Sequence, residues 1–169
     1  VLLCPGQGAQ KVGMGRDLAE RFPAARDSFA AIDAALAFPL SRVMWEGPEA
    51  DLNDTLNTQP ALMIHSIAAL KYLQSAHPEV QPSFTAGHSM GELSALVAAG
   101  ALDFPAALKL VRTRGELMKA AGVRSPGGMA AVMGLDIPAL DRICAEASAP
   151  GEIVQVANDN CPGQVVVSG

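Results

Sequence analysis

The chain has 169 residues, of which 50% are hydrophobic and 17% are charged, so it can bury a core and a disordered chain is excluded. Its formal net charge of -5 lacks the basic surplus of nucleic-acid or anionic-membrane binders, and its apolar stretches are too short to cross a bilayer. Its three cysteines show no metal-ligand or redox spacing, which favours reduced thiols in a cytoplasmic protein. We therefore expect no nucleic-acid partner, no membrane association and no bound metal.

The first half of the chain alternates short strands with helices. Val1 to Cys4 is an apolar run stopped by a Pro-Gly pair, which is typical of a buried parallel strand. Helical patterns follow at residues 16–37 and 60–74, and Thr58 is the expected N-cap of the second. A second strand, over residues 83–87, leads into a tight turn. This order predicts an α/β layer with a parallel sheet.

Two more helices are expected, at residues 89–99 and 103–121, and the sequence pattern changes beyond them. A linker over residues 124–128 separates two predicted domains, 1–123 and 127–169. Beyond it the pattern predicts a strand, a helix and two strands, at residues 129–134, 137–147, 153–157 and 164–168, with "NDNCPG" as the last turn. This βαββ order predicts the start of a small antiparallel α+β subdomain. Because a strand stands at each end of the chain, we expect a truncated protein.

The stretch "TAGHSMGELSALVAAG" places Ser89 between Gly87 and Gly91. It matches GxSxG, the nucleophile elbow, in which a strained strand-to-helix turn exposes the serine hydroxyl. A Cβ at either glycine would crowd the neighbouring strand or helix. The alternative is that Ser89 is a helix N-cap with Glu92 as its capping-box partner. Both interpretations fit this spacing.

A nucleophilic serine needs donors for the negative oxygen that forms beside it. A helix that starts at Ser89 would direct the backbone N–H of Met90 toward that oxygen. The loop "CPGQGAQ" leaves the end of the first strand, and the backbone N–H of Gln7 is the expected second donor. A dinucleotide-binding loop is rejected, because Lys11 occupies the position of the third glycine of GxGxxG.

Arg114 lies on the expected helix 103–121 among apolar neighbours. The residues three, four and seven positions away are Ala107, Leu110, Val111, Leu117, Met118 and Ala121, so Arg114 is expected to point with a buried stripe. No acidic residue stands at i±3 or i±4 to neutralise it. A buried guanidinium needs an anionic partner. That partner is either a carboxylate from elsewhere in the fold or the carboxylate of a substrate.

Five motifs together resemble the malonyl-CoA:acyl carrier protein transacylases, and the resemblance extends over essentially the whole chain. They are "PGQGAQ" at Pro5 to Gln10, "TQPAL" at Thr58 to Leu62, "GHSMGE" at Gly87 to Glu92, "RG" at Arg114-Gly115, and "NDNCPGQVVVSG" at the C-terminal end. The resemblance implies an α/β-hydrolase-like parallel-sheet domain with an inserted ferredoxin-like α+β subdomain, of which the chain holds the first portions. Leu93 departs from an aromatic that follows this serine turn in many relatives.

The resemblance also implies roles for the site residues. Ser89 would be the acylated nucleophile, Gln7 and Met90 the oxyanion hole, and Arg114 the ligand of the malonyl carboxylate. Gln59, His88, Asn158 and Asn160 would line the pocket, with His88 in a supporting role. The resemblance implies that the general base is a histidine well downstream, beyond residue 169. The histidines of the chain are poor substitutes, because His65 is expected to be packed among apolar neighbours on its helix and His77 to be exposed.

The implied activity is transfer of malonyl from CoA to the phosphopantetheine thiol of acyl carrier protein through an acyl-serine, in fatty acid or polyketide synthesis. No bound cofactor is expected, and malonyl-CoA and acyl carrier protein are the expected partners. One alternative is an α/β-hydrolase esterase or thioesterase, which shares GxSxG but delivers the acyl group to water. Another is a non-catalytic carrier-binding fragment, because the chain offers no good base of its own.

Overall fold

The structure is a computed structural model that describes residues 1–169, and the chain divides into two compact units, Val1–Ala120 and Ala121–Gly169. The elements of the first unit are β1 (Leu2–Cys4), α1 (Arg16–Arg21), α2 (Pro23–Leu36), α3 (Leu40–Glu46), α4 (Glu49–Asn53), α5 (Thr55–Ala76), β2 (Thr85–Gly87), α6 (Gly91–Ala98) and α7 (Phe104–Arg124), whose last turn enters the second unit. The elements that follow are β3 (Met129–Met133), α8 (Ile137–Ala147), β4 (Gln155–Cys161) and β5 (Gln164–Ser168).

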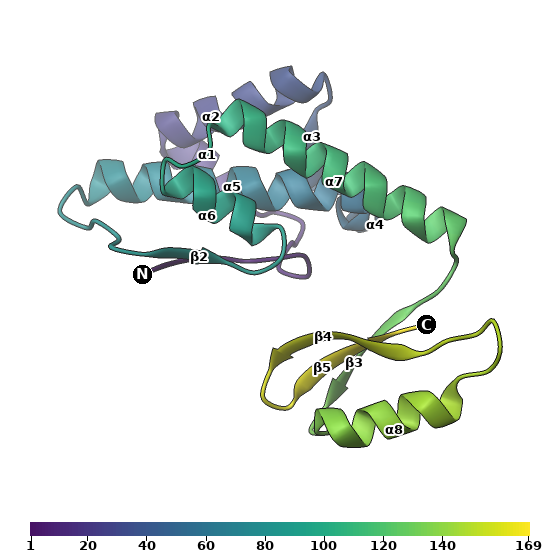
Figure 1. Cartoon of the computed structure of the whole chain (residues 1–169). Helices are drawn as coiled ribbons and strands as arrows, with labels where there is room; N and C mark the ends of the chain where they lie inside the picture. Colours follow the sequence, from purple (N-terminus) through teal and green to yellow (C-terminus); the bar gives the residue numbers. More distant parts are fainter. The chain divides into compact units, whose positions relative to one another are not determined.

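The parallel strand pair predicted for the first unit is present. β1 pairs with β2 in parallel, with Leu2 opposite Thr85 and Cys4 opposite Gly87. In Figure 1 the two strands run side by side, and α6 follows directly from the end of β2. Because both strands run the same way, the loop after β1 and the turn after β2 lie at the same edge of the sheet.

The predicted helix over residues 16–37 is wrong in one respect, because it is two helices. Pro23 opens α2, and Phe22 before it is extended, as residues before proline tend to be, so α1 ends there. Helices α3 and α4 were not predicted. They have seven and five residues and are separated by Gly47-Pro48, so neither is long enough to show a helical period in the sequence.

Helix α5 starts at Thr55, not at Pro60, so the prediction of Thr58 as N-cap is wrong. The N-cap is Asp54, whose carboxylate accepts a hydrogen bond from the Leu56 N–H at 3.0 Å. Pro60 lies inside the helix, where it has no N–H to offer the Leu56 carbonyl four residues earlier. Arg112 of α7 donates to that carbonyl from its Nη1 at 3.1 Å. A side chain of α7 thus replaces the hydrogen bond that the proline removes.

The Arg112→Ala variant of the protein that carries this chain is expected to lose about 1 kcal/mol of unfolding free energy, because the half-buried Leu56 carbonyl loses its donor. Arg112 also pairs with Glu116 at 3.3 Å on the helix surface, and such exposed pairs contribute little. Glu116→Gln, which removes only that pair, is therefore the matched control. Urea unfolding measures both variants, and equal losses in the two would contradict this role of Arg112.

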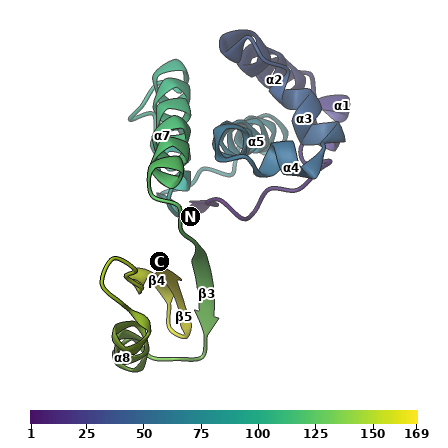
Figure 2. The ribbon, with the colours of Figure 1, turned by 90° about the vertical axis from the view of Figure 1, so that its right-hand side faces the viewer.

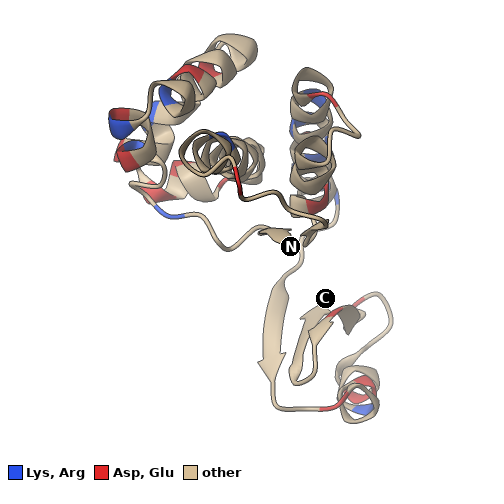
Figure 3. Ribbon diagram, turned by 90° about the vertical axis from the view of Figure 1, so that its left-hand side faces the viewer, with Lys and Arg blue, Asp and Glu red and all other residues tan.

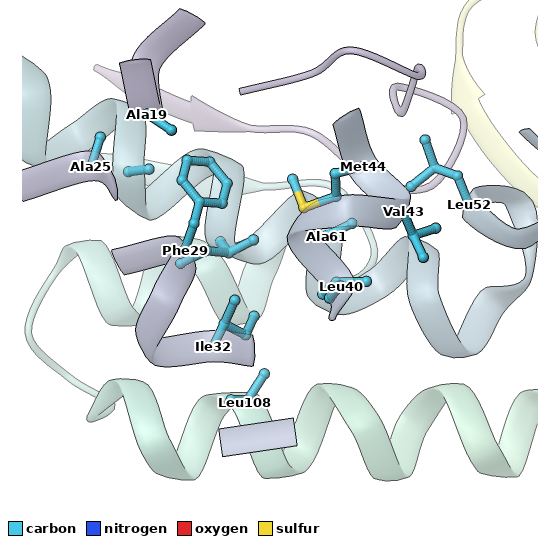
Figure 4. Close-up of a cluster of buried hydrophobic side chains, with 12 residues drawn as sticks. Ala19, Ala25, Phe29, Ile32, Leu40, Val43, Met44, Leu52, Ala61 and Leu108 are labelled. Atoms are coloured by element: carbon cyan, nitrogen blue, oxygen red, sulfur yellow. The ribbon is translucent and has the colours of Figure 1, made fainter. Parts of the chain in front are cut away.

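The core of the first unit lies where α2, α3 and α5 meet. Phe29, Ile32, Leu40 and Met44 belong to one buried cluster between these helices, and Leu108 of α7 lies below Ile32 in the view of Figure 4. Figure 2 looks along α5, with α7 on one side of it and α2 and α3 on the other. A second cluster packs α6 against α5 and α7; its buried members are Leu62, Met63, Ile67, Met90, Ala107 and Val111. The helix that follows the serine turn is therefore held on two other helices.

The second unit has the predicted antiparallel α+β order. Its sheet runs β3-β5-β4 with both pairings antiparallel, and α8 packs on it through a small core of Leu140, Cys144 and Val165. The predicted turn over "NDNCPG" is too long, because β4 continues to Cys161 and only Pro162-Gly163 remains for the turn. The strand keeps pairing through these polar residues by two register shifts, one on each side of Asn158 and Asp159.

Charged residues of both signs are interspersed along the helices (Figure 3), and β4, which contains Asp159, is the only strand with a charged residue. The helices of the structure include none whose length and apolar character would let it cross a membrane.

Candidate functional site

Ser89 lies on the tight turn between β2 and α6, with a φ of 54°, in the left-handed region. For a residue other than glycine this conformation costs about 1–3 kcal/mol, and it is common where a side chain must be presented at a functional site. The interpretation of Ser89 as a helix N-cap is wrong. The helix begins at Gly91 with Met90 as its N-cap, and no side chain caps it. Ser89 therefore precedes the helix and is exposed to solvent.

The glycines beside Ser89 are required by close backbone contacts. A Cβ on Gly87 would lie 2.0 Å from the Gly91 carbonyl carbon, and a Cβ on Gly91 would lie 2.2 Å from the Cys4 carbonyl oxygen. The loop after β1 needs the same freedom, since a Cβ on Gly6 would lie 2.7 Å from the His88 carbonyl oxygen. The loop and the serine turn are thus packed backbone to backbone, which only glycine permits.

Two backbone N–H groups beside the serine are free to act as donors. No hydrogen bond within the chain uses the N–H of Gln7 in the loop or that of Met90 at the start of α6. The His88 N–H donates to the Cys4 carbonyl at 3.1 Å, which ties the serine turn to the end of β1. Free N–H groups at a helix start favour a negatively charged oxygen nearby.

Arg114 reaches the serine from α7. Its Nη2 donates to the Ser89 Oγ at 2.8 Å, and its Nη1 donates to the Gln59 Oε1 at 2.6 Å. No carboxylate of the chain forms an ion pair with it. The guanidinium therefore has neutral partners only, and its charge remains available to an anion that comes from outside the chain.

The prediction that Arg114 points with a buried stripe is wrong, because the side chain is half-buried. Its neighbours Leu110, Leu117 and Met118 are 49%, 66% and 43% exposed. The buried residues of α7 are instead Ala107, Leu108, Val111 and Gly115, which face the core from the adjacent side of the helix. The apolar stripe in the sequence is wider than the surface that α7 buries, so Arg114 lies at its edge.

Gln59 is fully buried on α5, and its amide is bonded at both ends. Its Oε1 accepts from Arg114, while its Nε2 donates to the Thr55 Oγ1 at 2.8 Å and contacts the Met118 Sδ at 3.2 Å. Thr55 was not singled out in the sequence. It precedes "TQPAL" by three residues, and only the early start of α5 places it one helical turn before Gln59.

Of the other predicted site residues, the histidines lie in different surroundings. His65 is half-buried on α5, and burial lowers the pKa of its imidazole. His77 is exposed at the end of α5, with its Nδ1 3.3 Å from a Glu79 carboxylate oxygen. His88 is exposed on the serine turn.

Asn158 and Asn160 belong to the second unit, where both lie on β4, Asn158 exposed and Asn160 half-buried. The Asn160 Nδ2 donates to the Gln164 Oε1 at 3.4 Å. Their predicted role in lining the pocket therefore stays a prediction. Within the chain, no group of three or more His, Cys, Asp or Glu side chains is arranged to hold a metal ion.

Sequence comparison finds one family and close relatives. The model of the acyl transferase domain family matches residues 1–169. A malonyl CoA-acyl carrier protein transacylase of Bacillus subtilis is 48% identical over 167 residues, which are 99% of this chain and 52% of that protein. A protein of the same description from Staphylococcus aureus is 46% identical over 168 residues and is covered to 53%. The chain thus spans about half the length of the curated relatives it matches.

Solved structures that resemble this chain include enzymes of the same kind as these relatives. An acyl-carrier-protein-S-malonyltransferase from Bartonella henselae superimposes with a TM-score of 0.89 at 43% identity, over 100% of this chain and 54% of that one. A malonyl-transacylase solved in complex with a type II PKS acyl carrier protein gives a TM-score of 0.89 at 44% identity, over 99% of this chain and 54% of that one.

Proposed function

The chain belongs to the acyl transferase domain family, and from this premise we propose that the protein that carries it transfers malonyl from malonyl-CoA to an acyl carrier protein. The observation that carries the proposal is the Arg114 guanidinium, which lacks a carboxylate partner and lies 2.8 Å from the Ser89 hydroxyl. A planar fork of donors beside a nucleophile suits an acyl group that ends in a free carboxylate.

The proposed reaction has two acyl transfers. Ser89 Oγ attacks the thioester carbonyl of malonyl-CoA, its proton passes to a general base, and the C–S bond breaks to release CoA. The phosphopantetheine thiol of the carrier then attacks the malonyl-serine ester, and the serine oxygen regains a proton. We propose a histidine beyond residue 169 as the base. The N–H groups of Gln7 and Met90, both free of partners, would stabilise the oxyanion of each step.

Arg114 would bind the malonyl carboxylate throughout both steps, with Gln59 holding its Nη1. His88, Asn158 and Asn160 are proposed to line the pocket in supporting roles. The reaction needs no bound cofactor in this proposal, since the acyl group arrives activated as a thioester.

We also propose the two domain types of the fold, the biosynthetic role and the cellular compartment of the protein. The parallel pair β1 and β2 with its serine turn supports an α/β-hydrolase-like large domain, and the βαββ order of the second unit supports the start of a ferredoxin-like subdomain. A place in fatty acid or polyketide synthesis follows from the substrates. The free cysteines Cys4, Cys144 and Cys161 are consistent with a reducing, cytoplasmic compartment, and burial raises the pKa of the Cys4 thiol, which makes it a poor nucleophile.

A product assay tests the proposal. The protein that carries this chain is incubated with malonyl-CoA and phosphopantetheinylated acyl carrier protein, and malonyl-carrier and free malonate are quantified by mass spectrometry. Malonyl-carrier is the expected main product. Free malonate in its place would indicate a thioesterase, and carrier binding without either product would indicate a non-catalytic carrier-binding protein.

A further inference from the structure

We propose that Thr55 is a positioning residue, whose hydroxyl orients both the carboxylate-binding arginine, through Gln59, and the oxyanion loop, through Gln7. This inference rests on the proposed function and deepens it. Thr55 touches neither Ser89 nor Arg114 by any hydrogen bond of the structure, so its effect on the reaction would pass through the two glutamines.

A continuous series of hydrogen bonds joins the loop to the nucleophile. The Thr55 hydroxyl donates to the Gln7 Oε1 at 3.2 Å and accepts from the Gln59 Nε2 at 2.8 Å. The Gln59 Oε1 accepts from the Arg114 Nη1 at 2.6 Å, and the Arg114 Nη2 donates to the Ser89 Oγ at 2.8 Å. The series thus runs through Gln7, Thr55, Gln59, Arg114 and Ser89, and Thr55 is the member where its two branches meet.

The direction of each bond follows from the chemistry of the groups. A guanidinium has donors only, so the Gln59 amide must turn its oxygen toward Arg114 and its nitrogen toward Thr55. The Thr55 oxygen accepts from that nitrogen, which leaves the Thr55 hydrogen to donate to the Gln7 Oε1. A hydroxyl can accept and donate through the same oxygen atom. A valine of the same shape can do neither.

The backbone around Thr55 is fixed by its neighbours. Asp54 caps α5 immediately before it, and its carboxylate is bonded to the Leu56 N–H and to the Lys119 ammonium of α7. Gly115, next to Arg114, lets α7 come close: a Cβ there would lie 3.0 Å from the Thr55 carbonyl oxygen. The glycine of the "RG" pair therefore brings the arginine within reach of Gln59, while the first turn of α5 holds the threonine in place.

Losing the Thr55 hydroxyl is expected to affect the two branches differently. Without it the Gln59 Nε2 keeps only the Met118 sulfur as a partner, so the amide and the guanidinium on it lose a fixed position. This affects an acyl group with a free carboxylate. The Gln7 branch affects the oxyanion loop and hence every acyl group. We expect malonyl transfer to fall about tenfold and acetyl transfer to fall less, so that the malonyl-to-acetyl ratio decreases.

The test compares Thr55→Val and Thr55→Ser in the protein that carries this chain, with kcat/KM measured for malonyl-CoA and acetyl-CoA against the same carrier protein. Ser66→Ala is the matched control, because it removes a hydroxyl from the same helix whose bond goes to the Leu62 carbonyl, outside the series. Thr55→Val is expected to lose about tenfold on malonyl-CoA with a reduced malonyl-to-acetyl ratio, while Thr55→Ser and Ser66→Ala stay within about twofold of wild type.

Three results would overturn the inference. They are wild-type kinetics for Thr55→Val, equal losses for valine and serine, and an unchanged malonyl-to-acetyl ratio together with a lowered melting temperature, which would make Thr55 a scaffold residue. If the valine variant does not fold, Thr55→Ala against Thr55→Ser gives the same comparison. A wild-type protein that fails to load the carrier would instead refute the proposed function itself, so the two failures are distinguishable.

Discussion

Replacing Arg114 by alanine in the protein that carries this chain is expected to lower kcat/KM for malonyl transfer by about two to four orders of magnitude, while acetyl transfer persists or increases. Two hydrogen bonds to a charged group are each worth about 1.5–3 kcal/mol, and each 1.36 kcal/mol is a factor of ten. An acetyl group has no free carboxylate, so it forms no such bonds with Arg114 and loses none when the arginine is removed. The measurement is the malonyl-to-acetyl ratio of kcat/KM, from carrier loading with each acyl-CoA.

Two other variants separate charge from geometry. Lys109→Ala removes a positive charge from an exposed position of the same helix and is expected to leave the ratio unchanged. Arg114→Lys keeps the charge without the planar fork and is expected to recover only part of the malonyl preference. If Arg114→Ala kept the wild-type ratio, Arg114 would be a structural residue that binds Gln59 and Ser89 but no substrate.

Replacing Ser89 by alanine is expected to lower the rate of malonyl transfer by at least about a thousandfold, since the alanine has no oxygen to form the acyl-enzyme. The remaining free N–H groups of Gln7 and Met90 would still bind the oxyanion, so a small residual rate over the uncatalysed reaction is expected. Loading of the carrier protein, followed over hours, measures both rates.

Ser94→Ala is the matched control for that variant. Ser94 lies on α6, five residues after Ser89, and it is fully buried with a hydroxyl that has no hydrogen-bond partner. Its removal is expected to leave both activity and stability at or slightly above wild type. Substantial malonyl transfer by Ser89→Ala with an unchanged acyl preference would assign the nucleophile to another residue.

The local features of the site could be predicted from the sequence, because they depend on short-range rules. GxSxG between a strand-like and a helix-like segment predicts an elbow, and in the structure Ser89 has the strained φ that such a turn requires. The parallel pairing of the strands before Gly6 and before Ser89 also follows from the α/β order, and it places the loop of Gln7 beside the serine turn.

The contacts between α5 and α7 could not be predicted, because they depend on tertiary packing. Pro60 reads as a helix start, yet α5 begins five residues earlier, since Asp54 caps it and Arg112 supplies the donor that the proline lacks. Thr55 and Gln59 thereby fall one turn apart on α5, where the Thr55 hydroxyl accepts from the Gln59 amide and that amide accepts from Arg114. The width of the buried stripe on α7 depends equally on its neighbours, which is why Arg114 is half-buried and not buried.

Mass spectrometry of the acyl-enzyme tests the central claim most directly. The protein that carries this chain is mixed with malonyl-CoA without a carrier protein, quenched in acid and digested. The account predicts one malonyl group on the peptide that contains Ser89, which is lost when phosphopantetheinylated carrier protein is added before the quench. A folded protein that loads the carrier yet never carries malonyl on that peptide would contradict it.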